Sequence, residues 1–105
     1  MGECKVTVDA GVCKMTTVIK AKMNADGYVD IEIDSECPNI LRLSWGLKPE
    51  FAFVVVEEAM NKTQVYKLAS RELPHAACPV PSGIIKAIEV AGELGIKRDV
   101  SIKIE

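Results

Sequence analysis

The chain has 105 residues, of which 49% are hydrophobic and only 5% aromatic, so residues 1–105 suffice for one domain with a core of aliphatic side chains. The net charge is -2 and the basic residues are scattered along the chain, which excludes the basic patch typical of nucleic-acid binding. The longest apolar run, 51–56, is too short to cross a membrane, and no export signal is recognisable at the start, so we expect a cytoplasmic protein.

Three segments in the first third of the chain alternate apolar and polar residues with the period of a half-buried strand. These strands are predicted over 4–10, 15–23 and 29–33. Residues 24–27, Asn-Ala-Asp-Gly, are a typical hairpin turn between the second and third strands. Lysines on the outer face of the second strand oppose acidic residues on the third, which predicts a solvent-exposed face.

Four later segments carry helical signals. The first, 38–47, begins with a proline, which suits the first position of a helix. The segment 50–60 has signals for both helix and strand, and we favour helix. A cap within Asn61-Lys62-Thr63 precedes a helical repeat that reaches Leu73, and after a proline-rich connector the apolar residues of 84–94 again recur at helical spacing.

The end of the chain, 100–104, alternates again and predicts a last strand. We therefore expect an α+β, two-layer sandwich with the element order β-β-β-α-α-α-α-β. Its sheet is predicted to be four-stranded and mixed, with the last strand parallel to the first and beside it. The helices are expected to pack on one face of this sheet.

Three of the four cysteines and the one histidine make a candidate site. Two consecutive hairpins bring the end of the first strand and the end of the third to one sheet edge, so Cys13 and Cys37 share that edge. The helix that returns to a parallel last strand starts there too and adds Cys78. With His75, these residues make a ligand set suited to tetrahedral zinc or an iron–sulfur cluster, and we expect metal binding.

Other interpretations of the same residues stay open. Cys37 and Cys78 each precede a proline that can begin a helix, and helix amides favour a thiolate, so Cys78 could be a redox nucleophile with Cys37 as its resolving partner. His75 alone also fits a residue that bonds the last carbonyls of a helix. Cys4 is expected in the core.

A third class of function is an interaction module with structural cysteines and an exposed apolar patch. In addition, a free sheet edge could recruit a second copy and form a homo-oligomer.

The chain also resembles a known group of proteins. The motifs are Gly11-Val12-Cys13, Ser35-Glu36-Cys37-Pro38 and His75-Ala76-Ala77-Cys78-Pro79-Val80-Pro81. They resemble an uncharacterised family of short cysteine-bearing proteins from anaerobic microbes. The resemblance covers most of the chain and favours these three cysteines over Cys4, but it implies no activity. A thinner resemblance, to the osmotically inducible hydroperoxide reductases, rests on a Cys-Pro pair at the start of a late helix and supports only the redox interpretation.

Overall fold

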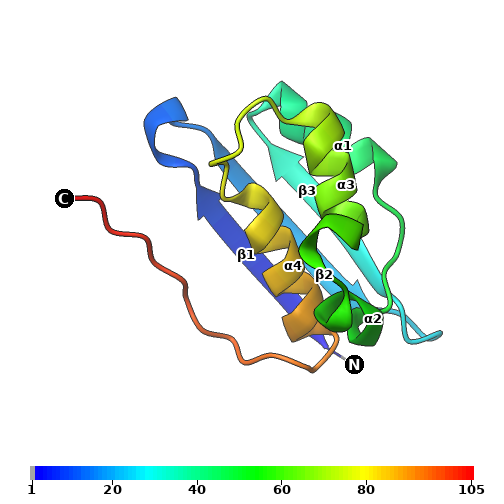
Figure 1. The fold of residues 1–105 in the computed structure, drawn as a ribbon. Helices are drawn as coiled ribbons and strands as arrows, with labels where there is room; N and C mark the ends of the chain where they lie inside the picture. The colour runs from blue at the N-terminus through cyan, green and yellow to red at the C-terminus, as the bar shows by residue number, and fades with distance from the viewer. Residues whose placement is uncertain (1) are drawn as a thin grey trace.

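The structure, a computed structural model, describes residues 2–105. These residues form one antiparallel sheet, in the strand order β1-β2-β3, with α-helices on one of its faces (Figure 1). In chain order the elements are β1 (Glu3–Asp9), the 3-10 helix η1 (Gly11–Cys13), β2 (Thr16–Met23), β3 (Val29–Ser35), α1 (Pro38–Gly46), α2 (Ala52–Glu57), the 3-10 helix η2 (Met60–Lys62), α3 (Gln64–Glu72) and α4 (Val80–Ala91).

The two predicted hairpins are confirmed. In the turn between β2 and β3, the Asn24 side-chain oxygen accepts the N–H of Asp26 at 2.9 Å and that of Tyr28 at 3.1 Å. Gly27 has a φ of 85°, which a glycine adopts without strain. The register places each lysine of β2 opposite an acidic residue of β3 on the uncovered face: Lys20 opposite Glu32 and Lys22 opposite Asp30.

The helix α4 lies closest to the sheet, across β1 and β2. A Cβ added at Gly83, near its start, would lie only 2.7 Å from Val8 Cγ2, whereas one added at Gly2, before β1, would meet the Ala91 carbonyl. The start of α4 therefore lies over the end of β1, and α4 runs antiparallel to that strand. The most deeply buried large side chains lie between these layers: Ile19, Val29, Ile40, Leu43, Val65, Val80, Ile84 and Ile88.

The predicted fourth strand is wrong. Within residues 2–105 the sheet has three strands, all antiparallel, and 100–104 pairs with none of them. Alternation makes a segment able to form a strand, but pairing also needs an adjacent sheet edge, and this segment leaves the body of the molecule after α4 (Figure 1). The two-layer α+β class and the one-sided packing of the helices are correct, while the four-stranded mixed sheet is not.

Two helix boundaries also differ from expectation. The helix α4 begins at Val80, inside the predicted proline-rich connector, because proline is tolerated in the first turn, where backbone N–H groups have no partner within the helix. The segment 50–60 is divided between α2 and η2. None of the helices formed by residues 2–105 is long and apolar enough to span a bilayer.

Candidate functional site

Three cysteines lie at the end of the sheet where β1 and β3 finish and where α1 and α4 begin. We call this the cysteine end. Cys13 closes η1, between β1 and β2, and Cys37 is the residue before α1. Cys78 lies two residues before α4, whose first turns pack over the end of β1. Segments far apart in the sequence thus meet at one end of the fold: the two hairpins place Cys13 and Cys37 there, and the start of α4 places Cys78 there.

Cys37 is held by a short chain of hydrogen bonds. Its N–H donates to Ser35 Oγ at 3.1 Å, and that oxygen lies 2.7 Å from the hydroxyl of Thr17, which is buried in β2. One residue earlier, the Glu36 N–H donates to the Thr16 carbonyl and the Glu36 carboxylate accepts the Thr16 N–H at 2.8 Å. The Cys37 side chain is half-buried against the core, so its position is fixed by the end of β3.

Cys78 is held in a tight turn. Its N–H donates to the His75 carbonyl oxygen at 3.2 Å, and its side chain is half-buried against the core. His75 itself is exposed. The connector 73–79 therefore keeps the Cys78 thiol near the packed start of α4 and leaves the imidazole in solvent.

Cys13 lies in the protruding part of the cysteine end. It is exposed, and its neighbour Val12 is 98% exposed. The turn is built on Gly11, with a φ of 81°, and on Lys14, which is left-handed with a φ of 58° and donates its N–H to the Gly11 carbonyl at 2.8 Å. No residue of η1 is buried, so this turn has little packing to hold it in place.

The four candidate ligands share an end of the fold but do not form a coordination sphere. Among residues 2–105, no three His, Cys, Asp or Glu side chains are close enough together to hold a metal ion. All four cysteines are free thiols. The described conformation therefore offers two half-buried thiols on the packed body of the protein, with Cys13 and His75 on exposed segments beside it.

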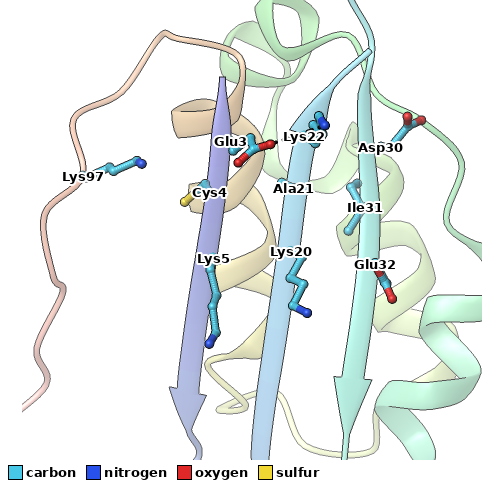
Figure 2. Close-up of a pocket in the computed structure, with 10 residues that line it drawn as sticks. All are labelled: Glu3, Cys4, Lys5, Lys20, Ala21, Lys22, Asp30, Ile31, Glu32 and Lys97. Carbon is cyan, nitrogen blue, oxygen red and sulfur yellow. Dashed lines mark ion pairs between the residues drawn. The ribbon is translucent and has the colours of Figure 1, made fainter. Parts of the chain in front are cut away.

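Cys4 lies at the opposite end of β1. It is half-buried against the core, and burial raises the pKa of its thiol, an effect that Lys97 partly offsets. A hollow of about 580 Å³ adjoins it, lined by charged residues of all three strands and by Lys97 from the C-terminal segment (Figure 2). Sequence reasoning missed this hollow, because alternation places charges on a sheet face without showing that the C-terminal segment borders them.

Together these features define a small α+β protein with a three-stranded antiparallel sheet and a cysteine-bearing end. The chain belongs to a family of unknown function, DUF6951, whose model matches residues 4–104. The expected membership in an uncharacterised family is thus confirmed, whereas the anaerobic origin stays a prediction. Searches of curated proteins and of solved structures gave no match.

Proposed function

We propose that this protein binds a metal ion, either zinc or the iron of an iron–sulfur cluster, through the thiolates of Cys13, Cys37 and Cys78, with His75 as the fourth ligand. One observation carries the proposal: three free thiols from three distant segments lie at one end of the fold. Sulfur and imidazole donors in this ratio are what tetrahedral zinc and several iron–sulfur sites use.

Binding in this proposal requires the cysteine end to close. Cys37 and Cys78 are half-buried just before α1 and α4, whereas η1 and residues 74–77, which include His75, are exposed and can move toward them. The metal would supply the energy for that closure, since a ligand that binds only the folded, closed state stabilises it by about 2.7 kcal/mol at a hundred times its dissociation constant. Metal should therefore raise the stability of the protein as well as occupy the site.

The test is anaerobic purification of the full chain, followed by metal analysis, acid-labile sulfide analysis and visible absorption. Zinc without sulfide supports a mononuclear site, and iron with sulfide supports a cluster. We expect the affinity for the metal to fall at least tenfold in each of three variants, Cys13→Ser, Cys37→Ser and Cys78→Ser. Cys4→Ser is the matched control, since Cys4 lies at the other end of β1, and it should bind metal like the unmodified chain. Equal losses in all four variants, or no uptake by the unmodified chain, would refute the proposal.

Thiol redox chemistry is the second candidate, and it is favoured by the placement of two half-buried cysteines before two helices. In that reaction the Cys78 thiolate attacks a hydroperoxide, forming a sulfenic acid and releasing an alcohol. The Cys37 thiol then displaces water from the sulfenic acid and forms a disulfide. Thiol counting in metal-free protein separates the candidates: peroxide should remove two thiols as one Cys37–Cys78 disulfide, and no loss would exclude this reaction.

A role in association is also proposed, in one form: a homo-oligomer through a sheet edge. The observation behind it is that β1 pairs only with β2 and leaves its other edge uncovered among the described residues. Exposed apolar side chains on α2 and η2, among them Phe53, Val54 and Met60, also fit an interaction surface. The free thiols fit a reducing compartment, and we propose the cytoplasm.

A further inference from the structure

The C-terminal segment 96–105 is an unpaired strand-like arm. All ten residues are exposed and none belongs to a helix or strand. The alternating apolar side chains are Val100, Ile102 and Ile104, which are 65%, 77% and 91% exposed. A segment that alternates apolar and polar residues can pair as a strand with the free edge of a sheet, where its apolar side chains extend the apolar face of that sheet.

The outer edge of β1 has these properties. The carbonyl of Gly2 accepts the N–H of Met23 in β2, and the N–H of Ala10 donates to the carbonyl of Met15, just before β2. Because hydrogen-bonding direction alternates along a strand, the N–H and C=O groups of the odd-numbered residues of β1 point away from the sheet. These outward residues are Glu3, Lys5, Thr7 and Asp9. The even-numbered side chains face α4 but are only half-buried, because no strand lies beyond them: Cys4, Val6 and Val8.

The two segments are complementary in one parallel register. With the acidic Asp99 beside Lys5, Lys103 falls beside Asp9, so two pairs of opposite charges face each other on the open face. The same register sets Val100 beside Val6 and Ile102 beside Val8 on the face that α4 covers. For 98–104, no antiparallel register that keeps the apolar residues on this face pairs more than one pair of opposite charges.

A single chain leaves both elements unused. Lys97 lies near Cys4 at the start of β1, but the arm then diverges from its own β1 and ends well away from the body (Figures 1 and 2). At about 3.3 Å per residue the arm reaches about 33 Å, and a seven-residue strand such as β1 needs about 23 Å. The arm is therefore long enough to cover β1 of a neighbouring molecule.

We propose that 98–104 of one copy adds as a parallel strand to the outer edge of β1 in a second copy, and that the exchange is reciprocal in a two-fold dimer. This inference rests on the proposed self-association and names the segment that makes it. Through one symmetric contact, this exchange gives hydrogen-bond partners to the outward N–H and C=O groups of β1 and to the backbone of the arm in both copies. It also covers the half-buried face of β1, which three strands leave open.

The test is the molar mass of the full chain by light scattering, with paired variants. Thr7→Pro removes an outward N–H that the β1–β2 ladder does not use, and Thr7→Ala keeps it. Ile102→Asp places a charge on the covered face of the arm, and Ser101→Asp places the same charge on its open face. We expect a dimer that Thr7→Pro and Ile102→Asp weaken at least tenfold, with unchanged circular dichroism, while both controls stay dimeric.

Deletion of 98–105 distinguishes exchange of the C-terminal arm from self-association by another contact. Loss of the dimer on deletion supports arm exchange. A dimer that survives deletion keeps self-association, for example by pairing of two β1 edges, and overturns the role of the arm. A monomeric full chain overturns both, and protection of 98–104 from hydrogen exchange in that monomer would show that the arm returns to its own β1.

Discussion

The contact between α2 and α4 gives the sharpest test of the packing. Gly92 follows the last residue of α4, and a Cβ added there would overlap Ala52 Cβ and lie 3.1 Å from the Ile88 carbonyl oxygen. Nonbonded carbons normally stand about 3.5–4.0 Å apart. Ala52 is buried at the first position of α2 and has no rotatable side chain, so only movement of the whole helix can relieve the clash.

Gly92→Ala is therefore expected to destabilise the fold. Overpacking of this kind costs about 1–3 kcal/mol, and the better helix propensity of alanine offsets at most about 1 kcal/mol. We expect a net loss of about 1–2 kcal/mol in the free energy of unfolding, measured by urea denaturation. Gly95→Ala is the control, because its Cβ would meet Glu89 Cβ at an ordinary 3.4 Å.

A second substitution tests whether the clash with Ala52 causes the loss of stability. Ala52→Gly removes the methyl group that a Cβ at Gly92 would meet, so the double variant should be more stable than the sum of the single effects predicts. The coupling free energy should be about 1–3 kcal/mol. If Gly92→Ala matches the Gly95→Ala control, or if Ala52→Gly gives no rescue, α2 does not pack on α4 as the structure has it.

Three further predictions concern single side chains. Thr63→Ala removes the hydroxyl that accepts the Tyr66 N–H at 3.2 Å and caps α3, so urea unfolding should show a loss of about 1–2 kcal/mol, and an unchanged midpoint would contradict the cap. Thr17→Val removes a buried hydroxyl that shares a 2.7 Å hydrogen bond with Ser35, and a loss of about 1 kcal/mol is expected in the same assay, whereas a gain would be inconsistent with it. Burial raises the pKa of the Cys4 thiol above its usual 9.0, so the free energy of unfolding should fall as pH rises through 9, because the thiol of the unfolded chain ionises first. For the same reason Cys4 should be alkylated more slowly than a small free thiol, and equal rates would argue against burial.

Local patterns were enough to predict the hairpins and most helices. The alternation in β2 and β3 is accompanied by a turn in which Asn24 accepts a backbone hydrogen bond and Gly27 adopts a positive φ. The start of α4 was misplaced because prolines at 79 and 81 were interpreted as a connector, although a first helical turn accepts them. These errors shift boundaries and leave the layers intact.

The last strand could not be predicted from its own residues. The side chains of 100–104 fit a strand, but no local signal says which edge receives them. The segments that carry Cys13, Cys37 and Cys78 nevertheless reach one end of the sheet, while the site that these residues were expected to form stays a prediction. We expected Cys78 at this end because the last helix would lead back to a parallel last strand. Cys78 lies there for another reason, since it precedes α4, which starts over Val8 at the end of β1.

The coordination geometry was beyond sequence reasoning for a related reason. Topology brings three segments to one end of a sheet, but the direction of each thiol depends on the backbone of η1 and of the connector 73–79. No residue of η1 is buried and 74–77 are exposed, whereas Leu73 and Cys78 of the connector pack against the core. The structure accordingly places the candidate ligands at one end without bringing three of them within reach of one ion.

The most direct measurement is an anaerobic titration of reduced, metal-free protein with cobalt(II), a spectroscopic substitute for zinc, followed through its thiolate charge-transfer absorption. We expect saturation at one ion per chain, an absorption intensity that drops in Cys13→Ser, Cys37→Ser and Cys78→Ser, and an unaltered spectrum for Cys4→Ser. A titration without charge-transfer bands, or one in which Cys4→Ser removes as much intensity as the other three substitutions, would contradict the claim that the cysteine end is a metal site.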